Sequence, residues 1–549
     1  MQPEADAFER LPIFRVGAPR TDPVLLHDLA KRVFGIESYE LHVDDDRLRL
    51  RAGSRRVELH RASGGVYAAD EAQRWNPTLS PRLPTEREAR ELADTFVVKN
   101  RMLPELRPPF SIAFTSLGGT HTARFDRAKK ARAQRQLDRQ ACYAVRVTLD
   151  APRGGRLVLP VVGGGGEFTV TVGDGGQVIA FDGVWRPVVS AVRELESPVV
   201  PRAEADERFK ELTKAMNVRS FECHLAYYAA PASSAQEFLY PVYVYRAIGT
   251  VGKNRVPLRL VTLPATRFGP PAVEPRPQPK RARKVRPGAR EAKLPRRGPQ
   301  SLAAFPLLLN PFEAGTSWIG QSGGLGGSQN NAQGFVDGLA ADGWLVNFNW
   351  GDANAWESDW RRNDDDWVDA ADFVFYTGHA SMDGWVLRSP DDGFMHWNEV
   401  GAGPASPGDL WGQQDLEWIV IAACGPLQDE ILAKGGGDLF ARWDGAFDGL
   451  HLLMGYGAIT FDNEDEGRLV VKYAREGQTL INAWLRAARE VQPADNGAAA
   501  PDGPTIWAGV MWVERSGLAS PANDHLWGHG SVAPDPTSPD TYVAMWTTT

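Results

Sequence analysis

The chain has 549 residues, of which 43% are hydrophobic and 24% charged, a composition typical of globular proteins but a length too great for one core. The formal net charge is −8, and the three cysteines (Cys142, Cys223 and Cys424) are too few, and odd in number, for a disulfide scaffold. No apolar run approaches the ~20 residues of a membrane helix, and the first residues lack a secretory signal pattern, so we expect a cytoplasmic protein without a membrane partner.

Charge and tryptophan content divide the chain into parts. Residues 1–265 carry a net charge of +7, residues 266–300 carry +9 and residues 301–549 carry −24. Sixteen of the eighteen tryptophans follow residue 300. Such shifts mark domain boundaries, so we expect an N-terminal region over 1–265, a linker over 266–302 and a C-terminal domain over 303–549.

The N-terminal region is predicted to be α+β, built from three repeated units of one helix followed by strands. Hydrophobic periodicity and start signals, including a capping box from Thr85 to Glu88, predict three helices over 22–34, 85–100 and 204–216. The predicted strands span 40–42, 48–52, 57–61, 144–149, 156–161, 167–172, 177–181, 221–228 and 238–247. Segments 175–187 and 239–245 resemble PepSY-type propeptide domains, which implies an inhibitory pro-region; a generic α+β module without that role is the alternative.

The linker is basic and rich in proline, a composition that keeps a chain extended. We expect it to be the site of an activating cleavage, and a plain tether is the alternative. Candidate cut positions are Arg283, Arg286, Arg290 and Arg297. No aromatic residue interleaves with the basic run over 280–286, so we expect no nucleic-acid partner.

The C-terminal domain is predicted to be α/β with a mainly parallel sheet, because strands and helices alternate. Predicted strands span 305–309, 344–350, 372–377, 418–423, 450–456 and 507–513, and predicted helices span 330–341, 428–434 and 467–490.

Two of these strands end close to a reactive side chain. His379 follows the strand over 372–377, and Cys424 follows the strand over 418–423. The carboxyl ends of neighbouring parallel strands meet at one edge of a sheet, so we expect the imidazole to lie beside the thiol. That pair suffices for thiolate catalysis, and the predicted helix after Cys424 would help to stabilise a thiolate.

These two blocks, 45 residues apart, resemble the caspase-like (clan CD) cysteine peptidases, although Ala380 stands where that family has glycine. Residues 376–379, 349–352 and 524–528 also resemble an uncharacterised bacterial domain-of-unknown-function family. The resemblance implies a mostly parallel six-stranded sheet flanked by helices and a cysteine endopeptidase with a His379–Cys424 dyad. It further implies oxyanion donors at Gly378 and Gly425, and we expect neither a cofactor nor a metal.

Acidic loops near the same edge are candidates for binding a basic residue of a substrate, because a partly buried carboxylate selects arginine or lysine. The candidate residues are Asp352, Glu357, Asp359, Asp462 and Glu464. The expected partners are a protein or peptide substrate and the chain's own N-terminal region, and the oligomeric state stays open.

Two other functions stay open. An inactive scaffold of the same fold could hold a basic partner on its acidic, tryptophan-rich surface. A carbohydrate hydrolase could stack sugars on the C-terminal tryptophans.

Overall fold

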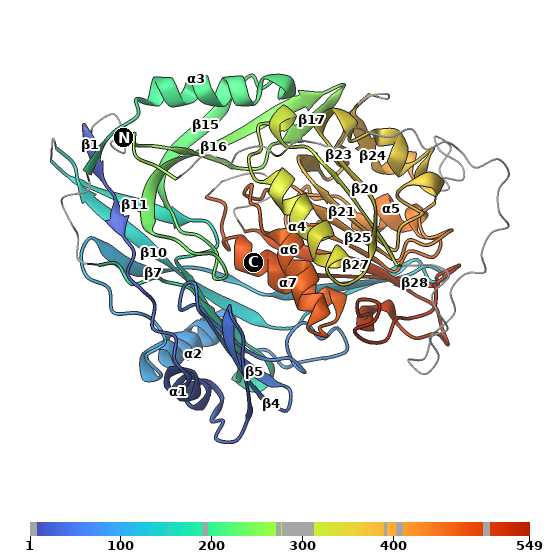
Figure 1. Ribbon diagram of the computed structural model, residues 1–549. Helices are drawn as coiled ribbons and strands as arrows, with labels where there is room; N and C mark the ends of the chain where they lie inside the picture. The colour runs from blue at the N-terminus through green and yellow to red at the C-terminus, as the bar shows by residue number, and fades with distance from the viewer. Residues whose placement is uncertain are drawn as a thin grey trace.

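The computed structural model describes residues 8–152, 154–189, 196–270, 276, 312–388, 392–401, 410–497 and 505–549. Within them the chain forms two large sheets, one built by the N-terminal part and one mostly by the C-terminal part (Figure 1). The predicted linker over 266–302 and the predicted strand over 305–309 lie largely or wholly outside the described residues.

The N-terminal part builds a fourteen-stranded sheet. Its strands are β2 (Phe14–Arg15), β3 (Glu40–Val43), β4 (Arg47–Ala52), β5 (Arg55–His60), β6 (Val66–Asp70), β7 (Phe110–Gly118), β10 (Arg139–Asp150), β11 (Arg156–Val162), β12 (Glu167–Val172), β13 (Val178–Gly183), β15 (Phe221–Tyr228), β16 (Phe238–Val251), β17 (Asn254–Pro257) and β18 (Val261–Pro264). The main path is β17-β16-β15-β11-β10-β12-β13-β6-β5-β4-β3; β18 and β2 pair with β16, and β7 pairs with β10. The short strands β1 (Arg10–Pro12) and β14 (Glu196–Pro198) pair separately.

The predicted repeat of helix-plus-sheet units is wrong. The three helices of this part, α1 (Pro23–Phe34), α2 (Glu86–Lys99) and α3 (Arg202–Leu212), form where the sequence predicts them. The Thr85–Glu88 capping box is also present. Most of the strands between the helices, however, join one continuous sheet in which only β11 and β15 pair in parallel. Local patterns predicted the elements, but they did not specify which strands pair across the chain.

The second sheet has nine strands in the order β20-β19-β21-β25-β26-β27-β28-β8-β9. Their bounds are β8 (Thr120–Asp126), β9 (Ala131–Gln136), β19 (Glu313–Trp318), β20 (Leu345–Gly351), β21 (Phe373–Thr377), β25 (Trp418–Ala422), β26 (Leu452–Tyr456), β27 (Trp507–Glu514) and β28 (Thr541–Thr548). The five strands from β20 to β26 are parallel, and the remaining neighbours pair antiparallel. Three further short strands, β22 (Ala380–Ser381), β23 (Gly384–Val386) and β24 (Phe394–His396), form a sheet of their own.

The predicted mostly parallel six-stranded sheet is therefore wrong: the sheet is mixed, and two of its nine strands, β8 and β9, come from the N-terminal part. Two helix predictions also fail. Residues 428–434 form turns, because the Asp429 carboxylate accepts the backbone N–H groups of Ile431 and Leu439 and so holds a loop. The predicted helix over 467–490 is two helices, α6 (Glu466–Arg475) and α7 (Leu480–Val491), separated by a turn at Gly477.

Both faces of the nine-stranded sheet are buried at its central strands β21, β25 and β26. The helices α4 (Ser328–Ala340), α6 and α7 cover one face (Figure 1), and alternate residues of β25 such as Trp418 and Val420 pack in their core. The intervening Ile419 and Ile421 face a second core. That core contains four fully buried, mutually packed tryptophans near the short helix α5 (Leu439–Trp443), namely Trp360, Trp385, Trp411 and Trp443. These four indoles are core residues and offer no surface for stacking a sugar.

Candidate active site

The two predicted site residues occupy equivalent places on neighbouring parallel strands. In the register of β21 and β25, Thr377 pairs with Ala422, and each chain continues two residues further, to His379 and Cys424. Neighbouring strands lie ~4.8 Å apart, so the register places both residues at one edge of the sheet. Both side chains are completely buried.

The sulfur of Cys424 lies against Thr460, in the segment that follows β26. The backbone N–H of Thr460 donates to Sγ at 3.4 Å, and the Thr460 hydroxyl lies 3.7 Å from the same sulfur. The N–H and the hydroxyl of Thr460 are thus two polar groups placed against the sulfur. No helix follows Cys424 directly, so the predicted support of a thiolate by a helix dipole is wrong.

Both ring nitrogens of His379 are hydrogen-bonded to backbone groups. Nδ1 accepts the N–H of Arg259 at 3.0 Å, so the ring proton is on Nε2, which donates to the carbonyl of Gly323 at 2.8 Å. Burial lowers the pKa of His379 to about 4, so the ring is neutral at pH 7. In this arrangement the single lone pair of the imidazole is engaged by a residue of the N-terminal part.

That residue, Arg259, lies between β17 and β18 and enters the edge of the second sheet with its whole side chain buried. Its Nη1 donates to the Thr377 hydroxyl at 3.1 Å and to the Ala422 carbonyl at 2.8 Å. The guanidinium thus bridges the ends of both strands that carry the candidate dyad. Its charge lies close enough to Cys424 for the two to interact.

A buried carboxylate, Glu466 at the start of α6, neutralises this arginine. Arg259 Nη2 lies 2.9 Å from Glu466 Oε1. Three neutral side chains complete the hydrogen bonding of the carboxylate, namely Asn331, Tyr456 and Gln492. A buried ion pair needs such additional donors, because its own attraction barely offsets the loss of water.

Only one of the five predicted substrate-binding carboxylates lies near Arg259. Asp462 interacts with the arginine electrostatically, and burial raises the pKa of Asp462 to about 6. Asp352 instead accepts the backbone N–H groups of Gly320 and Ser322, and so supports the loop whose Gly323 carbonyl contacts His379.

Of the other three carboxylates, two are buried and one is exposed. Glu357 pairs with Arg361 at 2.8 Å and is buried, and Asp359 is buried beside it. Glu464 is exposed and accepts the side-chain amide of Asn330 at 2.8 Å.

The two glycines predicted as oxyanion donors stand at positions where a side chain would clash or would strain the backbone. A Cβ on Gly378 would lie 2.3 Å from the Tyr376 hydroxyl, and Gly425 has a φ of +81°. The structure therefore explains both glycines by packing and conformation, and their role as donors stays a prediction.

The residues that sequence reasoning missed are those of the arginine site: Arg259, Asn331, Thr460, Glu466 and Gln492. Glu466 is the last residue of the acidic run that begins at Asp462, so this run was the sequence feature from which Glu466 could have been predicted as a site residue. Arg259 carries no local signal, because an isolated arginine between two leucines is typical of an ordinary strand or loop.

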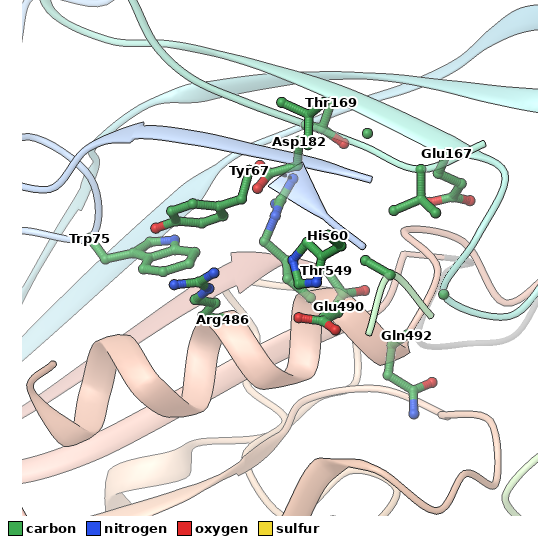
Figure 2. A pocket seen from close by; sticks show the side chains of 16 residues that line it. His60, Tyr67, Trp75, Glu167, Thr169, Asp182, Arg486, Glu490, Gln492 and Thr549 are labelled. Atoms are coloured by element: carbon green, nitrogen blue, oxygen red, sulfur yellow. Dashed lines mark ion pairs between the residues drawn. The ribbon is translucent and has the colours of Figure 1, made fainter. Parts of the chain in front are cut away.

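A separate cavity of about 60 Å³ lies between the two parts of the chain (Figure 2). Arg486 and Glu490 reach it from α7, and His60, Tyr67 and Asp182 line it from the N-terminal sheet. Its walls belong to the interface, in which Arg486 pairs with the buried Glu58. Neither His379 nor Cys424 lines this cavity.

None of the helices within the described ranges has the length and apolar character needed to cross a bilayer. Nor do the described residues contain a group of three or more His, Cys, Asp or Glu side chains placed to hold a metal ion.

No curated protein is significantly similar to this chain. A crystal structure of an uncharacterized protein from Eubacterium rectale is similar with a TM-score of 0.27 and 12% identity, over 47% of this chain and 85% of that one. Residues 314–549 match the family described as a domain of unknown function, DUF6345.

Proposed function

We propose that this protein is a cysteine endopeptidase with a His379–Cys424 dyad, held latent in the form described here. The observation that supports the proposal best is the register of β21 and β25, which gives the imidazole and the thiol equivalent places at the same sheet edge. The Thr460 N–H, which lies 3.4 Å from the sulfur, is a second feature of the site that the proposal uses. The relationship to caspase-like peptidases stays a prediction.

In the proposed reaction, His379 takes the proton of the Cys424 thiol once Arg259 no longer engages Nδ1. The thiolate attacks the carbonyl carbon of a peptide bond, and backbone N–H groups at Gly378 and Gly425 would bind the developing oxyanion. The imidazolium gives its proton to the departing amine as the C–N bond breaks. Water then hydrolyses the thioester, which releases the carboxylate product and regenerates the thiol.

A binding protein without catalysis is the second candidate, and the complete burial of both dyad residues favours it. Such a protein would use the arginine site to hold a segment of polypeptide without cutting it. For either function we propose a reducing compartment, the cytoplasm, which is supported by the free thiols of Cys142 and Cys223.

Labelling with a peptidyl acyloxymethyl ketone that ends in arginine tests the proposal. We expect covalent labelling of the Arg259→Ala protein and none when Cys424→Ala is added. Matched controls add Cys142→Ala or Cys223→Ala instead, and these should label normally, because burial raises the pKa of both thiols to about 11. Labelling that survives Cys424→Ala would reject the dyad, and no labelling in any variant would favour the binding protein.

A further inference from the structure

The acceptors around Arg259 form a complete site for a guanidinium group. All five of its N–H groups donate: Nε and Nη2 to the Phe461 carbonyl, Nη2 also to Glu466, and Nη1 to the ends of β21 and β25. A lysine ammonium has only three donors and would leave buried acceptors unmatched. The site is therefore matched to arginine and not simply to positive charge.

The main chain beside Arg259 is held by one β-bridge to the C-terminal part. Leu260 forms a parallel bridge with Phe461, in which its N–H donates to the Thr460 carbonyl at 2.8 Å and its carbonyl accepts the Asp462 N–H at 3.0 Å. Pairing of an extended segment with a free backbone edge is a common way to bind a peptide. Thr460 thus contacts both this segment and the Cys424 sulfur.

The same segment disables the candidate base. The Arg259 N–H occupies Nδ1 of His379, and Nε2 is committed as a donor to the Gly323 carbonyl. A neutral imidazole has one lone pair, so His379 cannot take a proton from Cys424 while Arg259 stays in place. Only withdrawal of the segment frees the base.

We propose that Leu258–Leu260 is an internal inhibitory segment, that Arg259 occupies the substrate's arginine pocket, and that Glu466 is the residue that sets specificity for arginine. This inference rests on the proposed function and adds the substrate class and the means of latency. The segment is followed by β18, which ends at Pro264, immediately before the predicted linker. Cleavage of the linker would remove the covalent connection on that side and let β18 separate from β16.

The pocket is tested with a probe that replaces the atoms removed by mutation. Arg259→Ala deletes the part of the side chain that corresponds to ethylguanidinium, so this compound should bind the full-length variant saturably, as measured by calorimetry, and should not bind the unmodified protein. Adding Glu466→Gln should weaken binding about tenfold or more, the loss expected for a charged hydrogen bond. Ethylammonium, which lacks the planar fork, should also bind about tenfold more weakly.

Inhibition is tested by the rate of labelling with the arginine ketone. The Arg259→Ala protein should label at least about tenfold faster than the unmodified protein. Arg486→Ala is the matched control, because Arg486 is also a buried arginine that pairs with a glutamate of the other part. Arg486 lines the interface cavity, which neither His379 nor Cys424 lines. Equal acceleration by both variants would mean general loosening of the interface and would overturn the inhibitory role.

Arg259→Lys keeps the charge and the stem of the side chain and serves if the alanine variant fails to fold; it should label faster than the unmodified protein. The peptidase proposal and the arginine-pocket proposal can be rejected independently of each other. Binding of ethylguanidinium without any labelling retains the arginine pocket and rejects the peptidase. Labelling of Cys424 with no preference for arginine over citrulline in the ketone retains the peptidase and rejects the pocket.

Discussion

The ion pair of Arg259 and Glu466 allows a stability prediction that does not depend on catalysis. Arg259→Met keeps an unbranched side chain as far as the position of Nε and removes the guanidinium with all five of its hydrogen bonds. Glu466 then stays buried with donors from Asn331, Tyr456 and Gln492 but without a cation. Removing one partner of a buried ion pair costs about 3–5 kcal/mol.

Glu466→Gln should cost less, about 1–3 kcal/mol, because Arg259 keeps its bonds to the carbonyls of Phe461 and Ala422. The new amide would nevertheless place an N–H group opposite the donor of Asn331. The double variant leaves no uncompensated charge, so its loss should fall short of the sum of the single losses by about 2 kcal/mol.

Urea unfolding at pH 7, followed by tryptophan fluorescence, measures these free energies. The partly exposed pair of Arg124 and Glu514, 2.7 Å apart and also joining the two parts, is the control, and Arg124→Met should cost no more than about 1 kcal/mol. A loss below 1 kcal/mol for Arg259→Met, or additive losses in the double variant, would refute the buried-pair reasoning.

Three further predictions follow from other features. Burial opposes charge on His451, but the Asp524 carboxylate 2.5 Å away raises the pKa of this histidine to about 9. The stability that the charged histidine adds is complete below pH 6.5 and is lost as the pH rises to 9. Asp524→Asn should therefore make the melting temperature vary less with pH over that range. Because the pKa of Asp462 is raised to about 6 in the fold, stability falls as the pH rises from the ordinary value of 3.8, and this loss is complete above pH 6. Asp462→Asn should therefore raise stability at pH 7 by on the order of 2 kcal/mol, and an equal gain at pH 4 would contradict this. Limited proteolysis within 277–300 should yield two fragments that co-elute in size-exclusion chromatography, because β8 pairs with β28; separate elution would show that the shared sheet does not hold them together.

Strands with long β-branched or aromatic runs were predictable from the sequence. The prediction over 221–228 matches β15 in full, and those for β21, β25, β26 and β27 differ from the observed bounds by one or two residues. Short runs that are rich in β-branched and aromatic residues favour a strand over a helix. Because β21 and β25 were both predicted as buried parallel strands, their carboxyl ends were expected to lie side by side, and the observed register of the two strands confirms this.

Strands without such runs were missed. The sequence of β9, Ala-Arg-Ala-Gln-Arg-Gln, has no large apolar side chain, and β19 contains a glycine and an early glutamate. Such segments become strands through the backbone pairing that their neighbours offer, which is a tertiary property. The same limit hid the arginine site, since the partners of Arg259 lie more than a hundred residues away along the chain.

The pairing of β8 with β28 also constrains the order in which the chain can fold. The hydroxyls of Thr120 and Thr547 lie 3.0 Å apart, yet the two residues are 427 positions apart in sequence. During synthesis the hairpin of β8 and β9 is therefore complete long before its partner strand exists. Contacts of such long range form slowly, and an unpaired strand edge invites aggregation in the meantime.

The side chains of this hairpin are suited to that delay. Arg124 lies on β8, and Arg132 and Arg135 lie on β9. Charged residues on an open strand discourage pairing with other chains. In the finished fold the same arginines gain partners, since Arg124 pairs with Glu514 and Arg132 with Asp429. The positive charge of the N-terminal part can thus protect an unfinished chain before it helps to join the two parts.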